Sequence, residues 1–465
     1  MEFPHPRARL IEAASRESVG GAELLDRAGA SARDYANLPS GVVFVAVPMR
    51  IEAVVRYLGA WGAERVVLPL DVGVDPASLH ELVHRYEPAA VIGWEGEPPS
   101  GYNRRVTRAL GAFWSRGRES SAVPHSDLGL LLTTSGSTGS PKLVRLSRAA
   151  VVANTMAIID VLDIGSEEVT ISSLPFHYSF GLSVLQTHVV AGATVILESG
   201  GMVQRSFWDA VSRFGVMSIA AVPYQFEVMR RLRFDPARHP RLRTLTQAGG
   251  RLAPDRVTEF HERMVSAGGQ LFVMYGQTEA GPRMTTLPPE RLLEKLGSVG
   301  PALPGGRLSI RDDEGREATG ETAIGEVLYR GPNVMMGYAE KGTDLGRGDQ
   351  HHGLLETGDL GRLDSDGYLY LEGRRTRFGK VFGIRVSLDD VEAMVAGAGP
   401  VAAVSGDDRI IVWIEGGNEE ELHDRAVALA QRLHVHWTGV VIRAIDHLPL
   451  LPSGKVDRLQ LERLS

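Results

Sequence analysis

The stretch that decides the fold class is GVVFVAVPMRIEAVVRYLGAWGAERVVLPL, residues 41–70. Apolar runs and helical patterns alternate through this stretch and beyond it, in the order 41–47, Ile51–Trp61, 65–70, Pro76–Tyr86 and 89–94. Short apolar runs that alternate with amphipathic helices are typical of βαβ units around a parallel sheet. The sequence therefore predicts an α/β fold.

The same alternation continues along the chain, and its character changes after about residue 300. ATVILE (193–198), VMSIAAVP (216–223) and QLFVMYG (270–276) predict further buried strands. After them, PALPGGRLSI, GEVLYRG and GYLYLEGR are short strand-like runs separated by glycine turns. These runs predict a β-rich subdomain that completes a large N-terminal domain of stacked αβ subdomains.

The last part of the chain predicts a second, smaller domain. Helical patterns at Leu388–Ala396 and Glu419–Leu433 alternate with the strand-like runs PVAAVSG, RIIVWIEG and VVIRAID. We expect an N-terminal domain at 1–375 and a small, mobile α+β C-terminal domain at 376–465. The Gly-, Asp- and His-rich stretch Glu340–His352 predicts an exposed loop.

Composition narrows the class of protein. A chain of 465 residues exceeds what one hydrophobic core organises. The net charge of −7 and the pI of about 6.1 argue against nucleic-acid binding and against a polybasic membrane surface. The absence of cysteine excludes disulfides, thiolate metal sites and cysteine nucleophiles. No apolar run approaches the ~18 residues that suggest a membrane span, and the N-terminus has no apolar signal region, so a cytoplasmic protein is expected.

A candidate phosphate-binding loop lies in LGLLLTTSGSTGSPKLVRLS (128–147). Small residues let backbone N–H groups approach phosphate oxygens, and hydroxyl groups and one lysine add donors and charge. The residues concerned are Thr134, Ser135, Gly136, Ser137, Thr138, Gly139 and Lys142. Composition alone leaves a flexible polar hairpin loop equally open.

This loop does not have the spacing of a Walker A motif. That motif places Gly-Lys-Ser/Thr directly before a helix, whereas Ser-Pro separates Gly139 from Lys142 here. Pro141 disfavours helix at the residue before it, and the helix is expected to begin later, capped by Ser147.

Four further motifs follow the loop in order: YGQTEA (275–280), LETGDLGRLDSDGYLYLEGR (355–374), GRRTRFGKVFGIRVSLDDVE (373–392) and LPLLPSGKVDR (448–458). Together with TSGSTGSPK, they resemble the ordered core motifs of the adenylate-forming superfamily. That superfamily includes acyl- and aryl-CoA synthetases, peptide-synthetase adenylation domains and luciferases. The resemblance covers nearly the whole chain from about residue 40, and it is nearest in character to stand-alone acyl-CoA synthetases.

The resemblance implies a site for ATP and Mg²⁺. Residues 134–142 would cradle the phosphates, Glu279 would help to hold Mg²⁺ and Thr278 would contact the α-phosphate. Tyr275 would lie against adenine, in the segment that includes Gly276 and Gln277. Asp359 would accept both ribose hydroxyls, Arg374 would support the nucleotide, and Gly249 and Gly250 would frame adenine and the acid. Taken singly, each of these side chains could equally be a solvated or turn-capping residue.

The resemblance also implies two half-reactions. Lys455 would bridge the substrate carboxylate and the α-phosphate and offset the charge that develops there. The C-terminal domain would then rotate, and a thiol would attack the acyl-adenylate. Thr376 stands where the family usually has Asp or Lys as the hinge residue, which puts the hinge chemistry in doubt. Lys380, Gly383 and Arg385 match the loop that reaches the site during thiol transfer.

The acid is expected to be an acyl or aryl acid. LPFHYSFG (174–181) matches the family's gate segment, and His177, with Tyr178 beside it, stands where amino-acid-activating domains carry an aspartate. His177 is also a candidate catalytic residue, although a packed histidine is the alternative. Val222, Pro223 and Tyr224 are expected to line the acyl pocket together with Gly249.

The acceptor is left open by the sequence. Coenzyme A or the phosphopantetheine of a stand-alone carrier protein would receive the acyl group in an acid–thiol ligase. An amine would receive it in an amide ligase, and a non-catalytic homologue would only bind nucleotide. The four residues Lys142, Glu279, Asp359 and Lys455 argue against the last alternative. A monomer or homodimer is expected.

Overall fold

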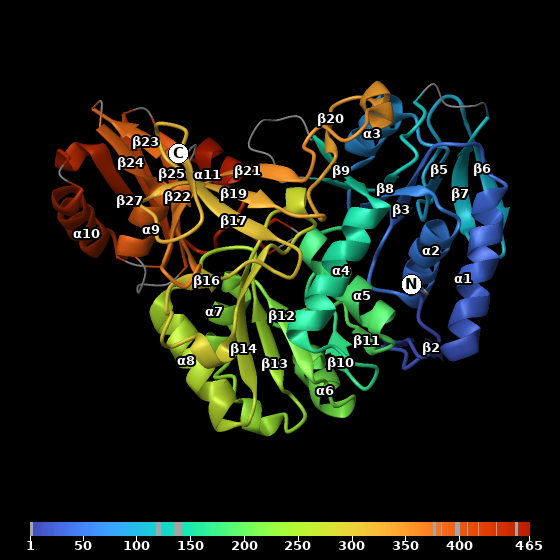
Figure 1. Cartoon of the computed structure of the whole chain (residues 1–465), viewed down its shortest axis with the longest axis horizontal. Helices are drawn as coiled ribbons and strands as arrows, with labels where there is room; N and C mark the ends of the chain where they lie inside the picture. Colours follow the sequence, from blue (N-terminus) through green and yellow to red (C-terminus); the bar gives the residue numbers. More distant parts are fainter. Residues whose placement is uncertain are drawn as a thin grey trace.

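The computed structural model describes residues 3–117, 122–133, 142–374, 378–382, 384–395, 400–406, 408–416, 418–433, 435–451 and 454–465. Figure 1 shows the elements in order along the molecule, from the blue N-terminal sheet, through the green and yellow sheets, to the red C-terminal elements at the opposite end. The predicted mixed α/β architecture is confirmed.

The first sheet contains the stretch at 41–70 that was quoted first. Its strands, in sheet order, are β20 (Gly337–Ala339), β9 (Leu143–Ser147), β8 (Leu128–Thr133), β4 (Val66–Leu70), β3 (Val42–Ala46), β5 (Ala90–Ile92), β7 (Gly111–Arg116) and β6 (Tyr102–Thr107). β3 pairs in parallel with both β4 and β5, and its five residues are all buried. Continuous burial is expected of a parallel strand that is covered on both faces.

The two helices predicted between the parallel strands are found, one with its predicted bounds and the other one residue longer. α2 (Ile51–Gly62) and α3 (Pro76–Tyr86) connect the parallel strands, and α1 (Gly21–Ala36) packs against α2. Asp75 caps α3, since its side chain accepts the Ser78 amide at 2.9 Å. Ser147 likewise accepts the Ala150 amide at 3.0 Å and caps α4 (Arg148–Leu162), so the helix after the candidate phosphate loop begins as predicted.

The second sheet carries the candidate site. Its strands, in sheet order, are β15 (Thr285–Leu287), β14 (Gln270–Tyr275), β13 (Thr244–Gln247), β12 (Ser218–Ala221), β10 (Val169–Ile171), β11 (Thr194–Leu197), β1 (Arg9–Glu12) and β2 (Ser18–Gly20). The six from β14 to β1 pair in parallel. The sheet's other helices are α6 (Arg205–Arg213), α7 (Pro223–Arg231) and α8 (Pro254–Ser266). α5 (Ser179–Ala191) is buried along almost its whole length, between α4 and this sheet (Figure 1).

The predicted β-rich subdomain is the third sheet. Its strands, in sheet order, are β16 (Ser298–Gly300), β22 (Leu369–Arg374), β21 (Leu354–Leu363), β19 (Gly325–Arg330), β17 (Arg307–Arg311) and β18 (Glu317–Ala318). Strand β20 leaves this region and pairs with β9, which places Tyr338 opposite Val144. The segment that follows β19 therefore returns to the first sheet, beside the candidate phosphate loop.

The stretch Glu340–His352 is only partly the exposed loop that the sequence predicts. A 3₁₀ turn at Gly342–Gly346 buries Asp344 and Leu345. Arg145, which is fully buried in β9, donates hydrogen bonds to the carbonyl of Met336 at 2.9 Å and to Gln350 Oε1 at 2.7 Å. A buried guanidinium requires such acceptors. The residues that supply them therefore pack against β9 instead of extending into solvent.

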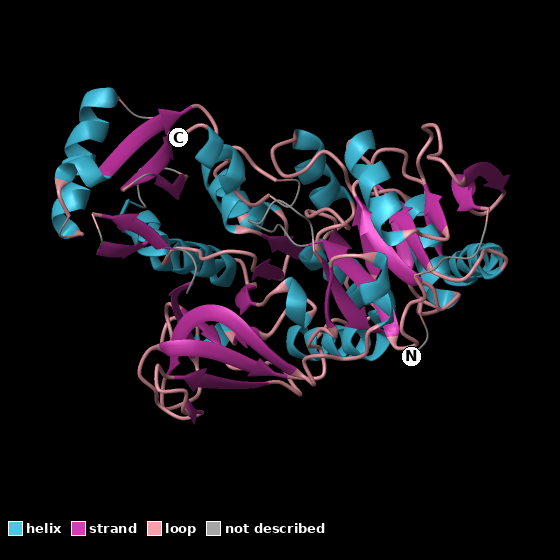
Figure 2. Ribbon diagram, turned by 90° about the horizontal axis from the view of Figure 1, so that it is seen from above, coloured by secondary structure: helices cyan, strands magenta, loops and turns pink. Residues whose placement is uncertain are grey.

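The C-terminal elements form two small sheets of their own. β23 (Phe378–Val381) pairs with β24 (Ile384–Ser387), and β25 (Val401–Gly406), β26 (Arg409–Glu415) and β27 (Val440–Ile445) form the other sheet. The helices are α9 (Leu388–Val395), α10 (Glu419–Arg432) and α11 (Arg458–Arg463). Figure 2 shows these strands and helices at the end of the molecule away from the N-terminus. Their cores contain only residues of this segment.

Candidate active site

The candidate lysine lies in a tight turn near the end of the chain. The Leu451 amide donates to the Lys455 carbonyl at 2.8 Å, and the Gly454 amide donates to the Leu451 carbonyl at 2.8 Å. Gly454 has a φ of +76°, and a Cβ on it would lie 3.1 Å from Val222 Cγ2. The turn therefore rests directly on the start of α7. Lys455 Nζ lies 5.2 Å from the centroid of the Tyr178 ring.

Gly249 and Gly250, which follow β13, form the surface next to Lys455 that is called the floor below. Gly249 has a φ of +83°, and a Cβ there would lie 2.7 Å from Tyr178 Oη, 3.0 Å from Val222 Cγ1 and 3.7 Å from Lys455 Cε. A Cβ on Gly250 would lie 3.2 Å from Pro223 Cγ. The backbone thus passes within contact distance of the tyrosine and the start of α7, which only glycine permits. Of the predicted pocket residues, Tyr178, Val222, Pro223 and Gly249 are brought together with Lys455 here.

His177 and Tyr224 take different positions at this site. His177 Nε2 lies 3.9 Å from Asp71 Oδ2, in the turn after β4. Burial lowers the pKa of His177 and the Asp71 carboxylate opposes that shift, so the imidazole is neutral at pH 7. Tyr224 packs against the core of the second sheet, in the cluster that includes Phe226.

A buried carboxylate forms the second part of the site. Asp359, on β21, is only 4 % exposed. Its Oδ2 accepts the Tyr275 hydroxyl at 2.5 Å and Gln277 Nε2 at 2.7 Å. Gln277 Nε2 also donates to the Thr357 carbonyl at 2.9 Å, and Asp359 lies opposite Arg374 in the strand register. The tertiary structure therefore assembles Tyr275, Gln277, Asp359 and the Arg374 backbone.

The turn after β14 connects this carboxylate with the rest of the site. A Cβ on Gly276 would lie 1.9 Å from the Pro282 carbonyl oxygen, so this close approach requires glycine. Thr278 and Ser179 share a hydrogen bond of 3.1 Å between their hydroxyl oxygens, which ties the turn to the start of α5. The carboxyl ends of parallel strands are the usual place for a ligand in an α/β sheet.

Glu279 and Lys142 lie on either side of one tyrosine. Tyr338 Oη donates to Glu279 Oε1 at 2.8 Å, and Lys142 Nζ lies 5.8 Å from the Tyr338 ring centroid. Lys142 Nζ also lies 2.9 Å from Glu340 Oε1. Neither Tyr338 nor Glu340 could be identified from the sequence, because only the pairing of β20 with β9 brings them to the candidate phosphate loop.

Several predicted residues cannot be placed. Thr134, Ser135, Gly136, Ser137, Thr138, Gly139, Thr376 and Gly383 lie outside the described residues, and so do the side chains of Arg374, Lys380 and Arg385. The backbone of Lys380 pairs with that of Arg385 in the β23–β24 hairpin.

The chemistry of the donors suits Mg²⁺ bound through phosphates. Within the described ranges, no three His, Asp or Glu side chains form a cluster that could hold a metal alone. Mg²⁺ keeps most of its water and typically binds one or two carboxylates plus substrate phosphates. The half-buried Glu279 carboxylate, held by Tyr338 near Lys142, fits that pattern.

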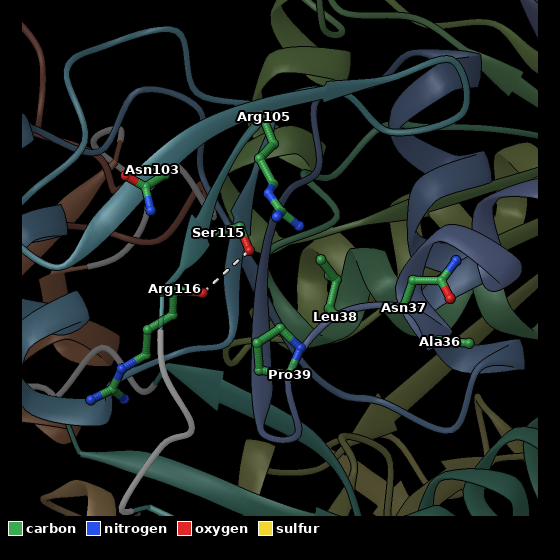
Figure 3. A pocket seen from close by; sticks show the side chains of 9 residues that line it. Ala36, Asn37, Leu38, Pro39, Asn103, Arg105, Ser115 and Arg116 are labelled. Carbon is green, nitrogen blue, oxygen red and sulfur yellow. Dashed lines mark hydrogen bonds between the residues drawn. The ribbon is translucent and has the colours of Figure 1, made fainter.

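A surface pocket of about 550 Å³ lies elsewhere, along the end of α1 and strands β6 and β7 (Figure 3). Arg116, one of its lining residues, donates to the Glu87 carbonyl at 3.1 Å and pairs with Glu87 Oε2 at 2.8 Å. None of the predicted site residues lines this pocket.

The sheets and the assembled residues define an adenylate-forming enzyme. Residues 22–339 match the model of a known family, the AMP-binding enzymes, and the chain belongs to that family. The match covers the first sheet, the second sheet apart from β1 and β2, and part of the third sheet, and it includes Lys142, Tyr178, Gly249 and Glu279.

The chain is also similar to individual relatives. It is 30% identical over 361 residues to the indoleacetate–CoA ligase of Aromatoleum aromaticum, covering 75% of this chain and 69% of that one. It is 26% identical to the L-proline–[L-prolyl-carrier protein] ligase of Streptomyces coelicolor, covering 89% and 85%. The structure of ATP-bound MatB from Rhodopseudomonas palustris matches with a TM-score of 0.77 at 24% identity, over 100% of this chain and 97% of that one. That likeness establishes the fold.

In the described part of the chain, no helix is long and apolar enough to cross a membrane.

Proposed function

We propose that this enzyme uses ATP to activate a carboxylic acid as its acyl-adenylate, with release of pyrophosphate, and then transfers the acyl group to a thiol. The contact of Lys455 with Tyr178 and with the floor at Gly249 carries the proposal. The support is that a cation from the C-terminal segment lies beside Tyr178 and Gly249, two of the residues predicted to line the acid pocket.

Each part of the nucleotide has a proposed partner. Asp359 accepts the ribose hydroxyls, Tyr275 lies against adenine, and Thr278 contacts the α-phosphate. The hydrogen bonds from Tyr275 and Gln277 support this role, because they hold the Asp359 carboxylate in one orientation in a buried position. Residues 134–142 bind the phosphates, Arg374 supports the nucleotide, and Glu279 is the proposed ligand of Mg²⁺.

Lys455 is the proposed catalytic cation of the first half-reaction. When the acid's carboxylate oxygen attacks the α-phosphorus, negative charge moves onto the equatorial phosphate oxygens and the departing pyrophosphate. A cation held beside those oxygens, in a site largely closed to water, lowers the barrier because it is placed before the charge develops. The tight turn around Gly454 limits how far Lys455 can move away.

The proposed acid is an acyl or aryl acid rather than an α-amino acid. The support is the position of His177, which is neutral at pH 7 and faces Asp71. A neutral imidazole at the position where amino-acid-activating domains carry an aspartate supplies no negative charge to hold a substrate ammonium.

The proposed transfer step requires the C-terminal segment to leave Tyr178. We propose a hinge near residues 375 and 376, with Thr376 as the hinge residue, since the small sheets after residue 378 have cores of their own. Lys380, Gly383 and Arg385 would then approach the site. The acceptor is coenzyme A or a carrier protein acting in trans, the two acceptors that the relatives' names state.

Pyrophosphate exchange over a panel of fatty, aryl, dicarboxylic and amino acids tests this proposal. We expect exchange with a subset of non-amino acids, followed by acyl transfer to coenzyme A or to a phosphopantetheinylated carrier, detected by mass spectrometry. If no acid supports exchange, activation is refuted; if exchange occurs without thioester formation, only the acceptor is wrong.

A further inference from the structure

A small internal cavity lies beneath the candidate active site, between α5 and the second sheet. Its volume is about 20 Å³, a little more than one water molecule requires. Most of its lining is apolar or hydroxylic: Leu162, Ile164, Thr170, Val184, Ser218, Ile219, Ala220, Thr244 and Thr246. The ionisable residues on its wall are Glu168, His188 and Arg283.

Arg283 is a buried cation whose charge has no partner in the described structure. Its side chain is among the largest that are buried in full, and its guanidinium carbon lies 4.6 Å from the centroid of the Phe180 ring. Within the described residues, its Nε has no hydrogen-bond partner and the guanidinium forms no ion pair with a carboxylate. Its backbone is fixed, since its carbonyl accepts Asn154 Nδ2 at 2.7 Å.

The groups around the guanidinium do not neutralise it. Burial lowers the pKa of Arg283 to about 9, so it is charged at pH 7. Burial raises the pKa of the neighbouring Tyr178 and lowers that of His188 to about 4, so both are neutral. Glu168 is the carboxyl on the wall, and the charges that act on it are those of Arg241 and Asp163.

A buried charge without a counter-charge is strongly unfavourable, and proteins normally pair it. Arginine is the side chain best suited to a buried carboxylate, because its planar fork donates two parallel hydrogen bonds to the two oxygens. Val184 and Ile164 in the lining, and Phe180 against the guanidinium, provide an apolar environment that strengthens such a pair.

Strands β12 and β13 line the cavity and also lead to the residues beside Lys455. Ala220 lines the cavity, and Val222, two residues further along, contacts Gly454. Thr246 also lines it, and Gly249 lies three residues further along, beside Lys455. At ~3.3 Å per residue, these offsets of two and three residues correspond to roughly 7–10 Å. Tyr178 contacts both sides, since its ring lies 5.2 Å from Lys455 Nζ and 6.3 Å, in a T-shaped arrangement, from the Phe180 ring that carries the guanidinium.

We propose that Arg283 binds a second carboxylate at the far end of the substrate, so that the enzyme activates one end of a dicarboxylic acid. This inference rests on the proposed activation of a carboxylic acid. The reacting carboxylate meets Lys455, the connecting chain passes Tyr178, and the distal carboxylate enters the cavity and pairs with the guanidinium.

The test compares dicarboxylic acids with monocarboxylic acids of the same chain length, from succinate to azelate, by kcat/KM in pyrophosphate exchange. We expect the wild-type enzyme to prefer one diacid over its matched monoacid by about 100-fold or more, as for a buried charge pair. Arg283→Met should abolish that preference mainly through KM for the diacid, and Arg283→Lys should restore part of it. Arg205→Met is the matched control, because the Arg205 side chain is 93% exposed on α6.

The wild-type preference needs no variant, so the test stands even if Arg283→Met fails to fold. Equal use of diacid and monoacid by the wild type would overturn the inference while leaving acid activation intact. An unchanged preference in folded Arg283→Met would also overturn it, since the guanidinium would then be purely structural or would hold a free anion. Calorimetric titration with the diacid distinguishes a failure of this inference from a failure of the proposed function. If the wild type binds the diacid, Arg283→Met does not bind it, and no acid supports exchange, then Arg283 binds the carboxylate and the proposed adenylation is refuted.

Discussion

Replacement of Lys455 by alanine separates the two proposed half-reactions. The side chain lies over the Tyr178 ring, and its Cε is 3.7 Å from the position that a Cβ on Gly249 would take. Its contact with the ring contributes about 0.5–1 kcal/mol at a partly exposed site. Lys455→Ala should therefore fold with nearly wild-type stability.

The loss in the adenylation step follows from Coulomb's law. An ammonium about 4 Å from a developing unit charge stabilises it by about 4 kcal/mol at an effective dielectric constant of about 20. Because 1.36 kcal/mol corresponds to a factor of ten, we expect the rate of exchange to fall about 10³-fold. The transfer of an acyl group from a supplied acyl-adenylate to the thiol should fall less than about tenfold, since Lys455 is expected to leave the site for that step.

Two assays on the Lys455→Ala variant test whether adenylation and thiol transfer depend differently on Lys455. The first measures carboxylate-dependent pyrophosphate exchange, and the second measures thioester formation from a synthetic acyl-adenylate. Lys341→Ala is the matched control, because Lys341 is exposed in the segment after β20. An equal fall in both half-reactions of Lys455→Ala would refute the alternation of the C-terminal domain.

Three further substitutions test other parts of the site. Asp359→Ala should raise the Kd for ATP about 100-fold by calorimetry, because two hydrogen bonds to a charged group contribute about 1.5 kcal/mol or more each; an unchanged Kd would remove Asp359 from the ribose role. Gly249→Ala should lower the free energy of unfolding by about 1–3 kcal/mol and abolish exchange, because the new Cβ would lie 2.7 Å from Tyr178 Oη at a φ of +83°. Exchange at the wild-type rate would show that the backbone at Gly249 can shift to accept the Cβ. Arg231→Ala removes a 2.9 Å ion pair between α7 and Glu415 of the C-terminal segment. Arg231→Ala should slow pyrophosphate exchange severalfold and leave thiol transfer intact. If thiol transfer slows instead, the ion pair belongs to the arrangement of the C-terminal segment that is used for transfer.

Much of the fold and part of the site could be predicted from local sequence. The strands at 41–47 and 65–70 and the helices between them are encoded by apolar periodicity, which acts over a few residues. Tyr275, Asp359 and Lys455 were identified because they lie in motifs, and the structure brings Tyr275 to Asp359 and Lys455 to Tyr178. Motifs report which residues are present, and the packing of three sheets decides where they meet.

The missed residues lie in segments without any local signal. Tyr338 reaches Glu279 only because β20 crosses to the first sheet, and Asp71 reaches His177 only because β4 ends beside the start of α5. Arg283 follows a motif, but nothing in the sequence indicates that its guanidinium would be buried without a counter-charge. The burial of Asp344 was missed for a different reason: its partners are local, namely the amides of Glu340 and Lys341 and the Arg347 side chain, but the composition of the segment predicts exposure.

Tyr178 connects acid recognition with domain closure. Its ring faces Lys455 on one side, and its edge meets Phe180, against which the Arg283 guanidinium lies. A cation over an aromatic ring gains about 0.5–2 kcal/mol, whereas an ion pair at about 4 Å gains about 4 kcal/mol at an effective dielectric constant of about 20. An acid whose carboxylate takes the place of the ring would therefore favour the arrangement in which Lys455 lies at the site by about 2–3.5 kcal/mol. Since a ligand shifts a conformational equilibrium by its difference in affinity for the two states, we expect the acid itself to promote the arrangement proposed for adenylation. We expect that charge pair to be lost once the carboxylate has reacted to form the adenylate, which would favour release of the C-terminal segment for the proposed transfer step.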